Sequence, residues 1–262
     1  MNITKNHLKR LKSLTQKKYR DENQQFLVEG IRLVEEAIDS DFELVEAVYT
    51  KELEEHVAGP NLLQKVRTKT SEVSEISDTE LNSLTDTVTS QGIAVVLRRK
   101  MFDPEVMFQP NGAASVLVAF DSVADPGNAG TMIRTCDWFG VDGILMGNNS
   151  VELYNPKVVR STAGGVFHLP IAENVDLRTA VTKCKELGYR VYVTDLQGET
   201  HFDKVTYEQK SLIIFGNEAW GVSDQLKDLA DVRVLIRRYG AVESLNVSVA
   251  CGVVLSNLHK LF

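Results

Sequence analysis

From residue 115 onward, the chain contains five short, continuously apolar stretches, each separated from the next by a helical or glycine-rich segment. They are SVLVAF (115–120), DGILM (142–146), YRVYVTD (189–195), SLIIFG (211–216) and VRVLI (232–236). Strands without polar alternation that are interleaved with helices are typical of a parallel sheet covered by helices on both faces. The pattern therefore predicts an α/β domain over residues 113–262.

The first third of the chain has the pattern of a separate, smaller α/β domain. Its expected elements, in order, are an apolar run ending in glycine (FLVEG, 26–30), a helix (31–40), a strand (43–50), a polar stretch with Ser and Asp as helix caps (68–90) and a buried strand (91–97). We therefore predict a domain over residues 22–97. A linker over residues 98–112, with two prolines and an Asn-Gly turn signal, follows it.

The last stretch of the chain is apolar on nearly all sides. Residues 244–262 read SLNVSVACGVVLSNLHKLF, without a polar face at helical spacing. Such a helix is expected to be buried, either in the core or against another subunit.

Composition narrows the class of protein. The 262 residues, 43% of them hydrophobic, suffice for two domains with sizeable cores. The sequence has no run of about 18 apolar residues, so no membrane span is expected. The basic start lacks the apolar stretch of a signal peptide. The three cysteines, Cys136, Cys184 and Cys251, have no C-x-x-C spacing, which argues against a zinc site or disulfide framework and fits a reducing cytoplasm. No ligand spacing indicates a metal.

Charge is distributed unevenly along the chain. The formal net charge is −7, yet residues 1–21 begin with seven Lys or Arg before the first acidic residue. We interpret residues 1–21 as a basic helical extension. A basic segment on an acidic protein suits a polyanion, because each cation displaces condensed counterions from it; a solvated helix face is the alternative that charge alone leaves open.

Three polar, glycine-bearing segments directly follow predicted strands, at residues 121–140, 216–223 and 237–250. In open α/β sheets the ligand binds beyond the carboxyl ends of the strands, so these segments are expected to form the site. The common signatures do not fit them. Gly127 and Gly130 lack the G-x-G-x-x-G spacing, and Gly221 is followed by Val-Ser where a P-loop requires Lys-Ser/Thr. No G-x-S-x-G or H-E-x-x-H motif is present.

Three motifs, in chain order, resemble those of the SpoU (TrmH-like) RNA ribose methyltransferases of the SPOUT superfamily: Asn128-Ala129-Gly130-x-x-x-Arg134, Phe215-Gly216-Asn217-Glu218, and residues 243–250 (ESLNVSVA). FLVEG with its helix also resembles the family's N-terminal, L30e-like substrate-binding module. The resemblance covers residues 22–262. It implies a trefoil knot in the C-terminal domain and a homodimer built around that knot. Such a knot is an exception to the rule that protein chains do not thread through their own loops.

The resemblance also implies S-adenosylmethionine (SAM) as cofactor and assigns residues to it. The expected SAM contacts are Thr194, Gly216, Ile236 and Leu245, mainly through main-chain groups. Glycine permits the close approach of backbone to a ligand, which suits Gly216.

Arg134 is the residue that the resemblance places in the catalytic centre, at the start of a helix where a phosphate could also bind. A guanidinium almost never loses its proton in a protein. We therefore expect Arg134 to grip an RNA phosphate and to favour the ribose alkoxide electrostatically, while phosphate or water takes the proton.

The supporting polar groups of the expected catalytic centre are Asn128, Glu218, Ser244 and Asn246. Glu218 could orient either Arg134 or a backbone loop. Ser244 and Asn246 could fix the ribose or cap the last helix.

Two positions depart from the family pattern: Ala219-Trp220 follows the motif glutamate, and Arg237-Arg238 follows Ile236 where proline is common. Both bear on the identity of the substrate. Trp138 is expected in the core because its neighbours are apolar, whereas the sequence leaves open whether Trp220 is exposed and stacks on a base.

The sequence thus predicts a cytoplasmic, homodimeric, SAM-dependent enzyme that methylates a ribose 2′-hydroxyl in structured RNA, ribosomal RNA in preference to transfer RNA. No membrane or DNA partner is expected. The alternatives are a non-catalytic RNA-binding protein that uses the L30e-like module and a SPOUT enzyme that methylates a base. The intact polar motif residues argue against the first, and Asn128 together with Arg134 favours ribose over base.

Overall fold

The computed structural model describes residues 3–85, 91–109 and 114–260, and it divides into two compact units. Unit 1 comprises Met1–Lys100 and Tyr154–Phe167, and unit 2 comprises Met101–Leu153 and His168–Phe262. The chain therefore passes from one unit to the other three times. In the expected linker, the turn signal at Asn111-Gly112 lies outside the described residues. Within the described ranges, no helix combines the length and apolar character needed to cross a membrane.

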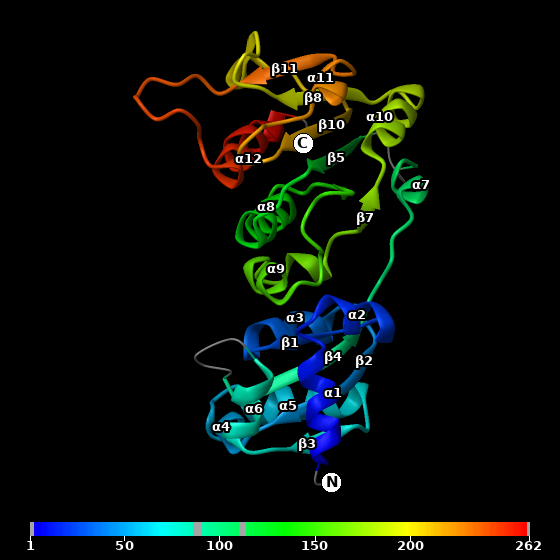
Figure 1. Ribbon diagram of the computed structural model, residues 1–262, viewed down its shortest axis with the longest axis vertical. Helices are drawn as coiled ribbons and strands as arrows, with labels where there is room; N and C mark the ends of the chain where they lie inside the picture. Colours follow the sequence, from blue (N-terminus) through cyan, green and yellow to red (C-terminus); the bar gives the residue numbers. More distant parts are fainter. Residues whose placement is uncertain (1–2, 86–90, 110–113, 261–262) are drawn as a thin grey trace. The chain divides into compact units, whose positions relative to one another are not determined.

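Unit 1 is built on a four-stranded mixed sheet in the order β1-β4-β2-β3 (Figure 1). Its strands are β1 (Gln25–Glu29), β2 (Leu44–Tyr49), β3 (Val73–Glu75) and β4 (Ile93–Arg98). Strand β4 is antiparallel to β1 and β2, and β3 is parallel to β2. The helices are α1 (Lys5–Ser13), α2 (Lys17–Asn23), α3 (Ile31–Asp39), α4 (Lys51–Glu55), α5 (Gly59–Lys69), α6 (Asp78–Leu84) and α9 (Pro156–Ser161), with the short 3₁₀ turn η1 (Gly165–Phe167). The predicted strands and the helix over 31–40 are confirmed.

The basic start of the chain is an integral part of unit 1. Leu11 and Leu14 are fully buried and pack in one cluster with residues of α6 and of strands β2 and β4. The Arg20 guanidinium is also buried and donates to the Leu14 carbonyl at 2.9 Å. Arg10 pairs with Glu46 of β2. The charge pattern predicts an extension here, but the apolar face of α1 holds the segment in the core.

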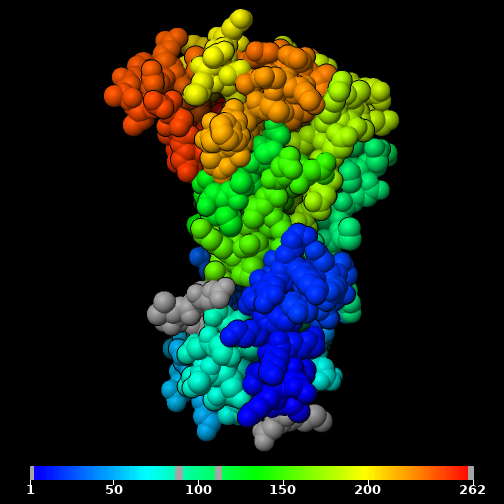
Figure 2. Space-filling model, in the orientation of Figure 1, coloured from blue at the N-terminus to red at the C-terminus, as the bar shows by residue number. Residues whose placement is uncertain are grey.

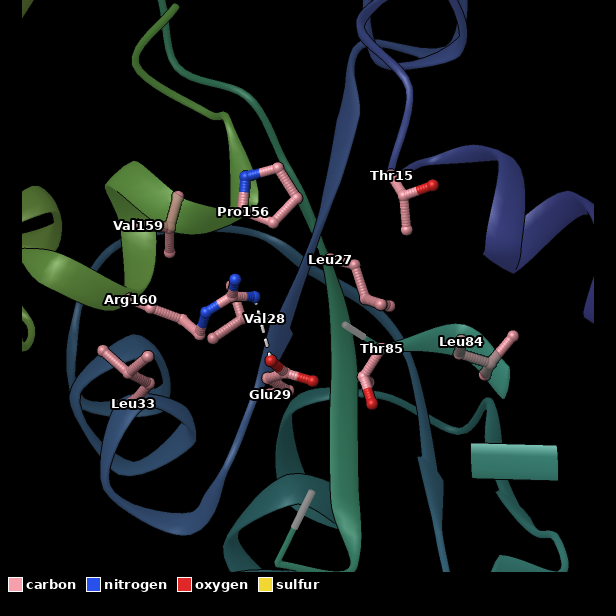
Figure 3. A pocket seen from close by; sticks show the side chains of 10 residues that line it. All are labelled: Thr15, Leu27, Val28, Glu29, Leu33, Leu84, Thr85, Pro156, Val159 and Arg160. Carbon is pink, nitrogen blue, oxygen red and sulfur yellow. Dashed lines mark hydrogen bonds and ion pairs between the residues drawn. The ribbon is translucent and has the colours of Figure 1, made fainter. Parts of the chain in front are cut away.

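The segment Tyr154–Phe167 lies between two strands of unit 2 in the sequence but packs in unit 1. The Tyr154 ring lies 4.4 Å from that of Phe26, and the Phe167 ring lies 5.3 Å from that of Phe42, between centroids. Arg160 of α9 pairs with the buried Glu29 carboxylate (Figure 3). The two atoms are 3.0 Å apart, and the pair lines a cavity of about 20 Å³. The continuous sequence pattern of residues 113–262 gives no signal for this excursion.

Unit 2 contains a seven-stranded, wholly parallel sheet in the order β7-β6-β5-β10-β8-β11-β9. Its strands are β5 (Ser115–Asp121), β6 (Gly143–Gly147), β7 (Ile171–Val175), β8 (Arg190–Thr194), β9 (Thr200–His201), β10 (Lys210–Gly216) and β11 (Val232–Leu235). The α/β fold with a parallel sheet, predicted from five apolar stretches, is confirmed. The two edge strands, β7 and β9, were not predicted from the sequence, because neither is a continuous apolar run.

Helices and short 3₁₀ turns accompany this sheet (Figure 1). They are α7 (Pro104–Met107), α8 (Pro126–Trp138), α10 (Leu177–Glu186), α11 (Asp224–Lys227), α12 (Val247–Leu255), η2 (Phe202–Lys204) and η3 (Ser256–Lys260). Pro126 follows Asp125, whose side chain accepts the Asn128 amide and so caps α8. Helices α8 and α12 pack against each other. The site is built where these two helices begin.

Trp138 is the last residue of α8 and is 84% exposed. The prediction that it lies in the core is wrong. Its apolar neighbours are misleading because the helix ends there, and Cys136 two residues earlier is the side chain that points inward.

Helix α12 is not buried on all sides within one chain. Cys251, Val254 and Leu255 are buried, whereas Val249 is 50% exposed and Leu245, just before the helix, is 46% exposed. The helix therefore buries one face in the core of its own chain, and its other face is exposed.

Candidate active site

Three of the residues expected to contact SAM lie at one edge of the unit 2 sheet. Strands β10, β8 and β11 are consecutive neighbours and parallel, so their carboxyl ends meet there. Thr194 ends β8, Gly216 ends β10 and Ile236 follows β11. The Thr194 hydroxyl donates to the Ile214 carbonyl at 3.2 Å, which ties β8 to β10 at this edge.

Gly216 begins a tight turn, and only glycine fits at position 216. The Asn217 amide donates to the Gly221 carbonyl at 3.0 Å, and the Gly221 amide donates back to the Asn217 carbonyl at 2.9 Å. A Cβ on Gly216 would lie 2.1 Å from both the Gly221 carbonyl carbon and the Val222 nitrogen. The turn thus folds back against the end of β10.

Asn217 holds this turn in place, a role that was not predicted from the sequence. Its side-chain oxygen accepts the Ala219 amide at 2.8 Å and the Trp220 amide at 3.3 Å. Its side-chain nitrogen donates to the Ser122 carbonyl at 2.7 Å, in the segment that follows β5. An asparagine directly before a turn was the available signal, because its side chain mimics backbone groups.

Glu218 binds the start of α8. Its carboxylate accepts hydrogen bonds from the Asn128 side chain at 3.0 Å and from the amides of Asp125 and Ala124 at 3.1 and 3.3 Å. The sequence left two roles open for Glu218, to orient Arg134 or to orient a backbone loop. In the structure Glu218 binds the loop before α8 and makes no contact with Arg134. Glu218 therefore holds two loops together at the edge of the sheet.

The environment of Glu218 keeps it ionised. Burial raises its pKa, but the hydrogen bonds from Asn128, Asp125 and Ala124 outweigh burial, and the net result is a pKa below the usual value for glutamate. A carboxylate with three N–H donors and a lowered pKa is a poor proton acceptor at neutral pH. Glu218 is accordingly a positioning group.

Asn246 connects the third motif to the first. Its side-chain nitrogen donates to the Asn128 side-chain oxygen at 3.0 Å. Its own oxygen accepts the amides of Ser248 and Val249 at 2.8 and 3.4 Å, so Asn246 is the cap of α12. The three motifs are thus joined in one chain of hydrogen bonds, Glu218–Asn128–Asn246.

The structure places Arg134 and Ser244 apart from this chain of hydrogen bonds. Arg134 is the ninth residue of α8, so the expectation that it lies at the start of a helix is wrong. At 3.6 residues per turn, its side chain leaves the helix about 120° around the axis from Asn128. Arg134 is exposed, and the described residues offer it no hydrogen bond or ion pair. Ser244 is exposed two positions before the α12 cap.

The segment between β11 and α12 projects from unit 2 (Figure 2). Tyr239 is 85% exposed and Val242 is 70% exposed, and the Arg238 guanidinium donates to the Val242 carbonyl at 3.2 Å. Leu245, the fourth expected SAM contact, ends this exposed segment directly before Asn246 and is 46% exposed.

A polar hollow of about 150 Å³ opens at the carboxyl ends of β5, β6 and β7. Asp121 lines it and accepts the Ser223 amide at 2.7 Å, which ties the beginning of α11 to the end of β5. The other lining side chains include Asn148, Asn149, Asp176 and Arg178. This hollow was not predicted from the sequence, because the side chains that line it at the ends of β6 and β7 come from segments without a motif.

Comparison with known proteins places this arrangement among RNA-modifying enzymes. The model of the SpoU rRNA Methylase family matches residues 115–256, and that of an MRM3-like substrate binding domain matches residues 5–95. The chain is 33% identical over 247 residues to the 23S rRNA (guanosine(2553)-2′-O)-methyltransferase of Bacillus subtilis, which covers 94% of this chain and 93% of that protein. An uncharacterized tRNA/rRNA methyltransferase of Synechocystis is 30% identical and covers 95% of this chain and 88% of the relative.

Solved structures agree with the sequence relatives. An rRNA methyltransferase from Sinorhizobium meliloti with bound AdoMet (SAM) superimposes with a TM-score of 0.87 at 26% identity, covering 100% of this chain and 97% of the other. An RNA methyltransferase described as putative and of the TrmH family, from Porphyromonas gingivalis, has a TM-score of 0.84 at 26% identity, with 98% of each chain covered.

Proposed function

Because the chain belongs to the SpoU rRNA methylase family, we propose that it transfers a methyl group from SAM to a ribose 2′-hydroxyl of ribosomal RNA. It is a SAM-dependent RNA methyltransferase, as the sequence motifs predict. The observation that carries the proposal is the hydrogen-bonded chain Glu218–Asn128–Asn246, which assembles all three motifs at one edge of the sheet. The named activity of the Bacillus relative supports ribosomal RNA and the 2′-oxygen.

The residues present at the strand ends fit SAM. Gly216 ends β10 and begins a turn of exposed residues, Thr194 ends the neighbouring strand β8, and Ile236 follows β11, the next strand along, which suits a ligand held by main-chain and aliphatic groups. When bound there, SAM supplies a methyl group on a positively charged sulfur. Leu245 lies directly before Asn246, which is bonded to Asn128, and would supply the fourth contact.

The chain's own residues account for the remaining requirements of the reaction. The 2′-oxygen forms the new bond to the methyl carbon as the carbon–sulfur bond breaks, and the hydroxyl proton leaves to water or to an RNA phosphate. Arg134 holds the phosphate and stabilises the negative charge that develops on the ribose oxygen. Asn128, Glu218 and Asn246 fix the loops, and Ser244 is available to bind the ribose.

The test of this function is transfer of labelled methyl to ribosomal RNA from cells that lack the protein. We expect incorporation at one or a few nucleotides that then resist alkaline cleavage, because a 2′-O-methyl group removes the attacking hydroxyl. Transfer RNA serves as the comparison substrate. Label on a base would instead support the base-methylating alternative, and SAM binding without transfer to either RNA would support a binding protein.

We also propose that unit 1 binds the RNA, in keeping with its substrate-binding family match. Deleting the basic start would not test this role, because Leu11 and Leu14 belong to the core. Lys5, Lys9 and Lys12 are better targets, since they are exposed, lie at helical spacing on α1 and form no ion pair among the described residues.

Replacing Lys5, Lys9 and Lys12 with Gln is expected to weaken RNA binding and to flatten its salt dependence. Three fewer phosphate contacts reduce the slope of log K against log salt by about 2 to 3. The matched control is Lys17→Gln with Lys18→Gln, since these lysines already face Asp21 and Glu22 on α2. An unchanged slope in the triple variant would show that this face does not touch RNA.

The exposed side of α12 supports the homodimer that the family implies; the trefoil knot stays a prediction. We expect a particle of twice the 29.2 kDa chain mass and expect Val249→Glu to shift it toward monomer, because a charge buried in an apolar contact is costly. Sedimentation velocity at micromolar concentration measures both. Val57→Glu, at a fully exposed position of unit 1, is the control. A wild-type monomer would contradict the proposed homodimer.

We also propose that the enzyme acts in the cytoplasm, as expected from the sequence.

A further inference from the structure

We propose that Trp220 is a stacking platform for a nucleobase of the RNA substrate beside the methylated ribose, an inference that rests on the function proposed above. Trp220 is 84% exposed. A large aromatic ring left in water gains nothing for folding, and burying it against a partner is favourable in proportion to its apolar area. The flat faces of nucleobases are well matched to such a ring.

The backbone that carries Trp220 is fixed before any ligand arrives. The Trp220 amide donates to the Asn217 side chain, and the adjacent Gly221 is held by two hydrogen bonds to the Asn217 backbone. Gly221 has a φ of +71°, which favours glycine and closes the turn directly after the indole. Only the two side-chain torsions of Trp220 remain to be ordered on binding, so the entropic cost of stacking is small.

The position of Trp220 points to the reacting nucleotide. It lies two residues after Glu218, so its Cα is within roughly 7 Å of the Cα of the residue that binds Asn128 and the start of α8. It lies four residues after Gly216, the expected SAM contact, and on the same turn. A base stacked there would belong to the target nucleotide or to its neighbour.

The charge at this edge suits RNA. Arg237 and Arg238 follow β11, and only β8 lies between β11 and β10 in the sheet. Both arginines are exposed. An exposed aromatic ring and exposed cations at the same ends of a sheet are a combination that binds single-stranded RNA, since the ring takes the base and the cations take the phosphates. This combination favours RNA over a second protein chain as the occupant.

The chain offers a matched control for this proposal. It has two tryptophans, and Trp138 is also 84% exposed but lies at the far end of α8 from the Glu218 cluster. Trp138→Phe leaves Trp220 as the sole tryptophan, so the fluorescence of that protein reports on Trp220 alone.

The experiment combines this fluorescence with steady-state transfer of labelled methyl to the ribosomal RNA substrate. We expect RNA to quench Trp220 fluorescence in Trp138→Phe. We expect Trp220→Ala to raise KM for RNA about tenfold or more, the scale of one lost base stack. SAM affinity and kcat at saturating RNA should change little. Trp220→Phe should retain most of the affinity, and Trp138→Ala should match the wild type.

Three results would overturn the proposal: fluorescence unchanged at saturating RNA, equal KM values for Trp220→Ala and Trp138→Ala, or loss of the dimer in Trp220→Ala, which would assign the ring to a protein interface. Failure of the proposed function looks different. In that case the unmutated protein transfers no methyl to RNA, while quenching of Trp220 by RNA still reports stacking.

Discussion

Arg134→Ala is expected to lose methyl transfer by about 10²-fold or more, the scale on which removal of one charge-stabilising donor slows an active site. Arg134 is exposed on α8, with no ion pair among the described residues to restrict it, so its cation is available to RNA. Fold and SAM affinity should be retained, because Gly216, Thr194 and Ile236 lie on other elements. Single-turnover transfer of labelled methyl measures the rate, and calorimetry measures SAM binding separately.

Two further variants sharpen the Arg134 test. Arg134→Lys should rescue poorly, because a point charge cannot reproduce the planar fork that holds phosphate and ribose oxygens together. Arg190→Ala is the control. Arg190 is an exposed arginine that begins β8, so it lies at the amino ends of the unit 2 strands, away from the site, and it pairs with Glu208. A transfer rate near the wild-type value in Arg134→Ala would remove Arg134 from the reaction centre.

Gly216→Ala is expected to abolish SAM binding and to lower the free energy of unfolding by at least about 3 kcal/mol, the upper range for overpacking. The added methyl would meet backbone atoms of Gly221 and Val222 at 2.1 Å, and backbone cannot rotate away as a side chain can. The turn must therefore open, which also displaces Glu218 from the start of α8. Urea denaturation and calorimetry with SAM measure the two effects.

The matched substitution is Gly240→Ala, in the exposed segment between β11 and α12. A Cβ there meets no atom within 4 Å, so stability should remain near that of the wild type. If Gly216→Ala binds SAM with normal affinity and unfolds at the normal urea concentration, the turn does not have the rigidity that the site requires.

The sequence was sufficient for five of the seven strands of unit 2, because these five read as mainly apolar runs, and three of them, β5, β6 and β10, are buried almost throughout. Strand β7 contains Glu173 and Asn174, and β9 has two residues, so neither produces that signal. Trp138 shows a second limit. Apolar neighbours predict burial only if the helix continues past the residue, and the end of α8 depends on contacts that a local pattern does not contain.

The residues of the site were recognisable, but their pairings were not. Glu218 and Asn128 are 90 positions apart, and Asn246 and Asn128 are 118 apart, so their contacts depend on the order of strands in the sheet. Charge also obscured a pattern that was present. Leucines recur every three residues along α1 and at its C-cap (Leu8, Leu11, Leu14), which indicates a buried face beneath the basic one.

The excursion of residues 154–167 has a consequence for modularity. Because the chain crosses between the units three times, unit 1 is not a cassette that can be cut out at a single junction and exchanged between enzymes. A fragment ending at Lys100 would lack the rings of Tyr154 and Phe167, which pack on Phe26 and Phe42, and the arginine that neutralises Glu29. A chimaera with a new RNA specificity would have to transplant both pieces together.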